Sequence, residues 1–165
     1  SKVVGNYVNS MLVKTLALRS GYDEAVILDP QGFVAECTGE NIFMVKDGVL
    51  WPPPLANILE GLTRDAILTL AGDLGIPVKE GLFTRDMLYV ADEVFITGTA
   101  AEVGGVRAID HRQVGSGKVG PVTRALSAEF ERTIHGQGDR SAQWLDTVRL
   151  AGSSDGNRTA AAPAT

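Results

Sequence analysis

Cysteine and histidine are scarce in this 165-residue chain, which contains one cysteine, Cys37, and two histidines, His111 and His135. A single cysteine excludes an intrachain disulfide framework, and two isolated histidines leave no cluster with the spacing of structural zinc ligands. No apolar run approaches the roughly 18 residues that a membrane-spanning helix needs. The first residues also lack the basic-then-apolar layout of a secretory signal. The sequence therefore predicts a cytoplasmic protein with no metal site and no membrane partner.

Positive charge is also limited. Lys and Arg together number 15 against 20 Asp and Glu, which gives a formal net charge of −5. Because nucleic-acid binding needs clustered positive charge, and the basic residues here are scattered, the composition predicts no nucleic-acid partner. The length and the 44% of hydrophobic residues suit one globular domain with a single core. Small molecules remain as candidate ligands.

Three segments repeat apolar residues at helical spacing, and a glycine stands at or just beyond the expected end of each. The expected helices cover residues 6–21, 63–75 and 121–134. Thr63 occupies the position of an N-cap in the second of them, and Thr84 is another cap candidate.

Short runs rich in β-forming residues alternate with these helices. The expected strands are residues 25–28, 33–35, 42–45, 49–51, 93–97 and 106–109. Turn residues at Asp29–Gly32 and at Asp47-Gly48 predict two hairpins. We therefore predict an α/β domain over residues 1–150, followed by a disordered tail at 151–165 that is rich in Ser, Gly, Ala, Thr and Pro.

Polar and small residues gather in four segments, Lys2–Tyr7, Glu36–Asn41, Glu60–Thr63 and Thr97–Ala101. A threonine at a helix start suits an anion such as phosphate, and a loop after a buried strand is a favoured ligand position. Each segment also has an ordinary structural explanation: a helix cap, a tight turn, a solvated turn or an exposed lysine near a chain end. The residues by themselves thus predict an α/β domain with a candidate anion site.

Taken together and in this order, the segments resemble the fold-type IV pyridoxal-phosphate enzymes, and most of all the branched-chain amino-acid aminotransferases. The four matching motifs are Lys2–Tyr7, Ala35–Phe43, Leu59–Asp65 and Thr97–Glu102. They resemble, respectively, the lysine segment, the glutamate segment, the phosphate loop, and the second phosphate and carboxylate loop of that family. The resemblance runs from residue 2 to about residue 149. It implies the fold of the large domain, an α/β mixed sheet or pseudo-barrel with surrounding helices.

The resemblance also implies roles around pyridoxal 5'-phosphate. Lys2 would form a Schiff base with the cofactor and would then carry the proton between the substrate Cα and the cofactor. Glu36 would pair with the pyridine nitrogen and keep it protonated. Tyr7 would hydrogen-bond the phenolic oxygen, and Leu59 would pack on the ring face.

The same resemblance implies how the two anionic groups are bound. Leu62, Thr63 and Thr99 would hold the cofactor phosphate. Backbone N–H groups of Thr99 and Ala100 would receive the substrate carboxylate. The implied reaction moves the amino group of leucine, isoleucine or valine to 2-oxoglutarate, within a homodimer.

Several alternatives remain within and beyond this family. The triplet Gly39-Glu40-Asn41 and Tyr7 favour the branched-chain enzymes over D-amino-acid aminotransferases, and aminodeoxychorismate lyase is a further relative. Glu40 and Asn41 themselves are expected to be structural. The family's smaller N-terminal domain has no counterpart here, so we expect a C-terminal large-domain fragment, and an inactive fragment is the remaining alternative.

Two positions depart from the family pattern. Gly104-Gly105 stands where relatives have Thr-Pro, and Pro52 stands where a threonine is common. Since two glycines free the backbone, we expect a loosened loop beside the substrate.

Overall fold

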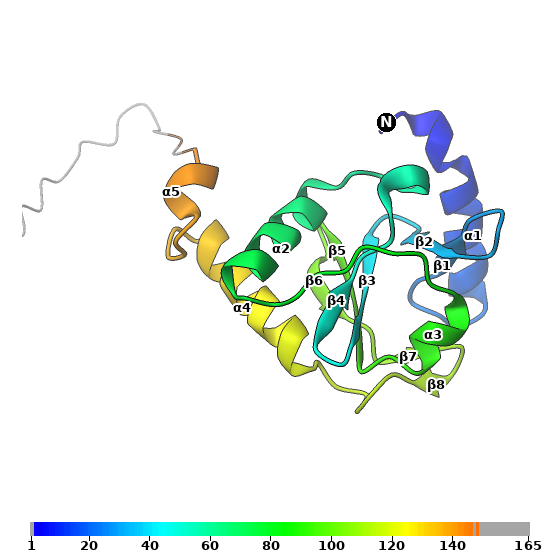
Figure 1. Ribbon diagram of the computed structural model, residues 1–165. Coiled ribbons are helices and arrows are strands. Elements are labelled where there is room, and N and C mark those ends of the chain that lie inside the picture. Colours follow the sequence, from blue (N-terminus) through cyan, green and yellow to red (C-terminus); the bar gives the residue numbers. More distant parts are fainter. Residues whose placement is uncertain (1, 147, 149–165) are drawn as a thin grey trace, which may run out of the picture.

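A four-stranded antiparallel sheet lies at the centre of the fold, in the order β4-β3-β5-β6 (Figure 1). The structure is a computed structural model, and it describes residues 2–146 and 148. The strands are β3 (Asn41–Lys46), β4 (Val49–Trp51), β5 (Glu93–Gly98) and β6 (Glu102–Gly105). Phe43 and Phe95 are paired across the two central strands, and their rings stack with centroids 4.9 Å apart.

The two faces of this sheet belong to two hydrophobic cores, because successive side chains of a strand point to opposite faces. On one face, Phe43, Val45 and Phe95 pack against α2 (Leu62–Asp73) and α4 (Pro121–Ile134). On the other face, Ile42 and Met44 pack with residues of the β1–β2 hairpin. In β3 and β5, odd-numbered residues therefore face α2 and α4, and even-numbered residues face the opposite core.

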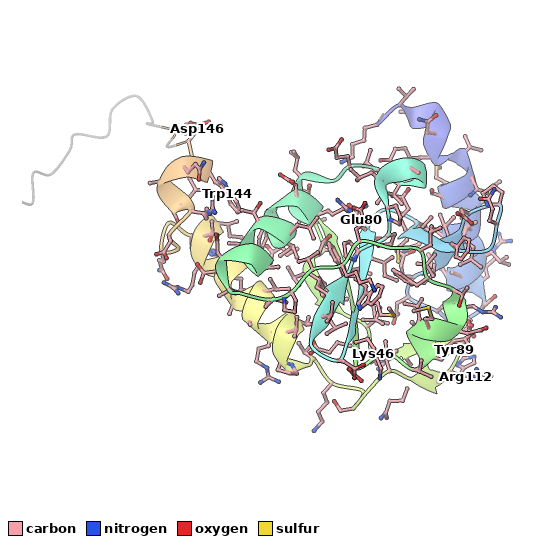
Figure 2. The ribbon with its side chains drawn as sticks, viewed as in Figure 1. Lys46, Glu80, Tyr89, Arg112, Trp144 and Asp146 are labelled. Atoms are coloured by element: carbon pink, nitrogen blue, oxygen red, sulfur yellow. The ribbon has the colours of Figure 1, made fainter. Side chains whose placement is uncertain are left out.

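The remaining elements surround the sheet. They are η1 (Val4–Tyr7), α1 (Val8–Arg19), β1 (Val26–Leu28), β2 (Val34–Cys37), η2 (Leu55–Asn57), α3 (Arg85–Tyr89), β7 (Ala108–Ile109), β8 (Arg112–Gln113) and α5 (Ser141–Trp144). Figure 1 shows α1 and the β1–β2 hairpin on the side of the sheet opposite to α2 and α4. The β7–β8 hairpin reaches α3 where the Arg112 guanidinium lies over the Tyr89 ring, 4.5 Å from its centroid (Figure 2).

Most of the predicted elements are confirmed, including the α/β fold class, the three longer helices and both hairpins. Asp47 and Gly48 have φ values of 52° and 74°, as a tight hairpin turn between β3 and β4 requires. Gly75, with φ 68°, follows the end of α2. Among the described residues, none of the helices is long and apolar enough to cross a membrane.

Two local predictions are wrong. Thr63 is not the N-cap of its helix: Gly61 holds that position, and Thr63 is the second helical residue. The expected strand at 106–109 is too long, because only Ala108–Ile109 form a strand there, and the strand before it, β6, was not predicted. Residue propensities did not predict β6, because two of its four residues are glycine, which is a poor strand former. The short helix α5 was not predicted.

The expected loosening at Gly104-Gly105 is also contradicted. Both glycines belong to β6 and pair with Ile96 and Phe95 of β5. A Cβ added to Gly104 would lie 3.3 Å from Ile96 Cγ1, so the missing side chain permits close packing rather than a loose loop. Pro52, the other departure, is buried after β4, and its carbonyl accepts a hydrogen bond from the Gly81 N–H (3.3 Å). The predicted tail at 151–165 lies outside the described residues.

Candidate active site

Glu36 is a half-buried carboxyl that the backbone holds in place. It lies on β2, and its Oε2 accepts a hydrogen bond from the Leu59 N–H at 2.9 Å. Burial raises the pKa of Glu36, and the Leu59 N–H opposes part of that shift. The side chain is therefore an oriented, partly desolvated acid, which is the state expected of a carboxyl that receives a charged partner.

Asn41 fastens the segment that follows Leu59. Its Nδ2 donates to the Leu59 carbonyl at 2.8 Å, and a Cβ added to Gly61 would lie 2.2 Å from its Oδ1. Gly61 has φ −77°, which any residue can adopt, so lack of space rather than backbone conformation demands glycine here. Asn41 is structural, as predicted: it fixes the path of 59–61 against the strands. Leu59 is consequently held through its N–H by Glu36 and through its carbonyl by Asn41.

The N-terminus of α2 is open to an anion. Its N-cap, Gly61, has no side chain to form a capping hydrogen bond, and Asp65 is the acidic residue of its first turn. The first backbone hydrogen bond of the helix runs from the Asp65 N–H to the Gly61 carbonyl. The N–H groups of Leu62 and Thr63 precede it, where the helix dipole favours negative charge. Leu62 is 89% exposed, so this turn can be reached from outside.

The N-terminus of α4 provides an internal contrast. There the buried carboxylate of Glu93 accepts hydrogen bonds from the N–H groups of Val122 (3.0 Å) and Thr123 (2.8 Å). Glu93 thus supplies a carboxylate to the backbone N–H groups of α4, whereas within the described residues no hydrogen bond joins the carboxylate of Asp65, the acidic residue in the first turn of α2, to the N–H groups of that turn. The N-terminus of α2 retains the capacity to bind an anion.

Thr97 adds an unsatisfied hydroxyl to the same face of the sheet. It is 1% exposed, and its Oγ1 has no hydrogen-bond partner among the described residues. It is directly opposite Asn41 in the β3–β5 ladder, and such pairs share one face of a sheet, so Thr97 and Asn41 both lie on the α2 side. The sequence motifs singled out its loop but gave roles to Thr99 and Ala100 alone. The pairing of Thr97 with Asn41, which places Thr97 on the α2 side of the sheet, could be seen only in the folded structure.

Arg64 anchors the open end of α2 to the rest of the fold. Its guanidinium is buried, and Nη2 donates to the Pro53 carbonyl and to Glu80 Oε2, each at 3.0 Å. Figure 2 shows Glu80 over the central part of the molecule, on the segment that leads from α2 to α3. The Nη2 group is held by these two partners, while Nε is buried and has no hydrogen-bond partner among the described residues.

The other predicted residues lie on exposed segments. Lys2 is exposed just before η1, Tyr7 is half-buried at the end of η1, and Thr99 and Ala100 are exposed after β5. Within residues 2–146 and 148, no hydrogen bond or ion pair joins Lys2 or Tyr7 to Glu36. In Figure 1 the N-terminus and η2, which leads into α2, both lie at the top of the view. The contacts that are observed join Glu36, Leu59 and Asn41, and Lys2 is not among them.

Three comparisons with known proteins agree on one family. The family model described as Amino-transferase class IV matches residues 2–109. The chain is 50% identical over 149 residues to a probable branched-chain-amino-acid aminotransferase of Aquifex aeolicus, covering 89% of this chain and 48% of that protein. It is 46% identical over 149 residues to the branched-chain-amino-acid aminotransferase of Pseudomonas aeruginosa, covering 90% and 48%.

Solved structures give the same result. The branched-chain amino acid aminotransferase of Escherichia coli superposes with a TM-score of 0.85 at 48% identity, covering 88% of this chain and 50% of that one. The enzyme of Thermobaculum terrenum in its PLP-form gives a TM-score of 0.85 at 39% identity, covering 88% and 48%. The chain spans about half the length of the curated relatives that it matches. It belongs to the class IV aminotransferase family, as its four ordered motifs predicted.

Proposed function

We propose that this chain is the pyridoxal-phosphate-binding part of a branched-chain-amino-acid aminotransferase. The reaction moves the amino group of leucine, isoleucine or valine to 2-oxoglutarate. The observation that carries the proposal is the segment Leu59–Gly61, which joins the oriented Glu36 carboxyl to the open N-terminus of α2. The names of the relatives support this substrate class over D-amino acids and over aminodeoxychorismate.

The residues present fit a molecule with a basic ring nitrogen and a phosphate. Glu36 offers a carboxyl whose Oε2 is already oriented by the Leu59 N–H. Leu62 and Thr63 offer N–H groups at the uncapped helix end, and the orphaned hydroxyl of Thr97 lies on the same side of the sheet. Leu59 lies between the two groups, where its side chain can cover the ring. Thr99 supplies a further hydroxyl after β5.

When bound, pyridoxal phosphate supplies an electron sink that stabilises negative charge at the substrate Cα. Glu36 holds a proton at the ring nitrogen. A positive charge beside Glu36 opposes the desolvation that raises its pKa, so ionisation of Glu36 and protonation of the ring nitrogen favour one another. Lys2, the proposed attachment residue, moves a proton at the substrate Cα through Nζ.

The remaining proposed roles are orientation and binding. The Tyr7 hydroxyl orients the ring through its phenolic oxygen. Backbone N–H groups of Thr99 and Ala100 bind the substrate carboxylate, since both residues are exposed in the turn between β5 and β6. The domain assignment, a large cofactor-binding domain over 1–150, is part of this proposal.

The proposal is tested by incubating the 165-residue chain with pyridoxal phosphate, reducing it with borohydride, and mapping the modified peptide by mass spectrometry. One adduct on Lys2 is expected, with none in Lys2→Ala. Modification spread over Lys14, Lys46 and Lys79, or no adduct on a folded chain, would contradict the cofactor site. Turnover of L-leucine, D-alanine and aminodeoxychorismate by the protein that contains this chain then separates the three activities.

We infer that the protein containing this chain is a homodimer. Apolar side chains of α1 support this, because Val8, Met11, Leu12 and Leu16 are each more than half exposed. Sedimentation of the protein that contains this chain, at increasing concentration, is expected to show association. A monomer at every concentration would contradict the inference. A cytoplasmic location is also proposed, in keeping with the unpaired, buried Cys37.

A further inference from the structure

The carboxylate of Glu24 joins three separate parts of the chain through hydrogen bonds. Its Oε1 accepts the Ala25 N–H (2.8 Å) together with the N–H (3.3 Å) and the hydroxyl of Thr38. Its Oε2 accepts Lys14 Nζ at 2.6 Å, and the same Nζ donates to the Asp23 carbonyl at 2.8 Å. The side chain of Glu24 is only 19% exposed. One partly buried carboxylate therefore connects α1, the segment that enters β1 and the turn that follows β2.

Both partners of the contact between α1 and Glu24 are charged at neutral pH. Burial acts to raise the pKa of Glu24, but hydrogen bonds from Lys14, Thr38 and Ala25 outweigh it and lower that pKa to about 2. The hydrogen bond to Glu24 in turn raises the pKa of Lys14. Hydrogen bonds between charged groups are stronger than those between neutral groups. The ion pair is therefore a firmer connection than an ordinary polar contact between a helix and a hairpin.

The Thr38 end of this connection lies close to the candidate acid. Thr38 directly follows β2, two residues after Glu36. In the β1–β2 hairpin Glu36 is opposite Ile27, and the contacts of Glu24 with Thr38 close the open end of that hairpin. The position of Glu24 is therefore fixed relative to that of Glu36.

The Lys14 end of the connection lies on the helix that follows the proposed attachment residue. Lys14 is seven residues beyond Tyr7, which is about two helical turns or roughly 10 Å along the axis. Lys2 precedes the same helix. Ala17 is the one buried side chain of α1, all of whose residues the structure describes. Since apolar packing within the described residues holds so little of α1, polar contacts such as the one with Glu24 decide how the helix lies against the hairpin (Figure 1).

We propose that Glu24 is a positioning residue that fixes the direction of α1 relative to the end of β2. It acts through Lys14 on the helix and through Thr38 on the strand. The distance between Lys2 and Glu36 depends on that direction, because Lys2 precedes α1 and Glu36 lies on β2. The consequence for catalysis rests on the proposed function, whereas the connection between α1 and β2 does not. Loss of Glu24 displaces the lysine and leaves the groups proposed to bind the ring nitrogen and the phosphate in place.

The first test separates binding of the ligand from its attachment to Lys2, in the protein that contains this chain. Pyridoxamine 5'-phosphate has an amine in place of the aldehyde, so its dissociation constant measures the non-covalent site alone. Lys2 Nζ condenses with the aldehyde of pyridoxal phosphate and releases water, and borohydride reduction of the C=N bond fixes the product for peptide mapping. In Glu24→Ala the affinity for pyridoxamine phosphate should be unchanged. The rate of Lys2 modification should fall roughly tenfold or more, because the two reacting groups no longer meet in the productive geometry.

Milder variants and a matched control separate this connection from general damage to the fold. Lys14→Met and Thr38→Val each remove one contact with the carboxylate, so each should slow the modification of Lys2. Lys14→Arg and Thr38→Ser keep a donor to the carboxylate and should restore most of the rate. Lys46→Met is the control, because Lys46 pairs with Asp92 at 3.0 Å and its side chain is 40% exposed, against 37% for Lys14. This variant should modify Lys2 at the unsubstituted rate.

The second test is hydrogen exchange of the backbone amides, which needs no ligand. In Glu24→Ala the amides of α1 should exchange faster than in the unsubstituted protein, and those of α2 and α4 should keep their rates. If α1 responds in this way and no protein attaches pyridoxal phosphate to Lys2, the proposed function fails and the connection stands.

Three results would overturn the proposal and leave the proposed function intact. The first is modification of Lys2 at the same rate in Glu24→Ala and in the unsubstituted protein. The second is a parallel loss of pyridoxamine phosphate affinity and of Lys2 modification, because Glu24 would then support the ligand site rather than the lysine. The third is unchanged hydrogen exchange in α1 while Lys2 is still modified.

Discussion

Gly61 is the position where one added methyl group should disturb the candidate site most directly. In Gly61→Ala the new Cβ would lie 2.2 Å from Asn41 Oδ1, which no van der Waals contact allows. Asn41 is only 6% exposed and its Nδ2 holds the Leu59 carbonyl at 2.8 Å, so its amide must turn and give up that hydrogen bond. The loss acts on the same Leu59 whose N–H orients Glu36.

The magnitude follows from two opposing effects. Leaving a buried polar group without its partner costs about 1–3 kcal/mol. Replacing glycine by alanine in an ordinary backbone conformation raises the free energy of unfolding by about 0.4–1 kcal/mol, because it restricts the unfolded chain. The free energy of unfolding should therefore fall by about 1–2 kcal/mol, and the melting temperature by roughly 2–4 °C per kcal/mol for a chain of this size.

The assay is urea and thermal denaturation of a double-mutant cycle with Asn41→Ala. Once Asn41 is truncated the clash is gone, so Gly61→Ala should then be neutral or slightly stabilising. Gly72→Ala in α2 is the matched control, because a Cβ there meets nothing within 4 Å, and it should stabilise by about 1 kcal/mol. An equal cost of Gly61→Ala with and without Asn41 would refute the reasoning, as would a stabilised single variant.

Three further outcomes can be measured. Thr97→Val removes an unpaired buried hydroxyl, so it should raise the free energy of unfolding by about 1 kcal/mol while weakening pyridoxal phosphate binding; lower stability with unchanged binding would contradict this. Glu93→Ala should cost about 2–4 kcal/mol in urea unfolding, because the N–H groups of Val122 and Thr123 lose a charged acceptor, and Glu93→Gln should recover part of the loss. Hydrogen bonds lower the pKa of Glu24 to about 2 in the folded chain, against 4.5 for an ordinary glutamate. Ionised Glu24 therefore stabilises the fold fully above about pH 4.5, and this stabilisation is lost as the pH falls towards 2. In Glu24→Gln the free energy of unfolding, measured in urea, should fall less steeply over that pH range.

Local signals in the sequence were sufficient for much of the fold. Asp47-Gly48 determines a hairpin turn through its two positive φ values, and the helical spacing of 121–134 needs no distant partner to be recognised. The same signals erred where tertiary packing outweighs propensity, as in β6, whose Gly104 fits closely against Ile96. The predicted start of α2 was two residues too late, because the N-cap is Gly61 and not Thr63. Contact with Asn41 requires glycine at position 61, and a capping hydroxyl plays no part in that requirement.

The sequence by itself determined the order of the motifs, and that order was enough to identify the family, because motif identity and spacing are properties of the chain alone. Only the tertiary structure decided which polar groups meet. The Glu36 carboxyl accepts the Leu59 N–H, and the Glu24 carboxylate accepts Lys14 Nζ and the Thr38 hydroxyl, through contacts between segments that are separated in the chain. Hydrogen bonding and burial depend on distances of a few ångströms, and those distances exist only after the chain has folded.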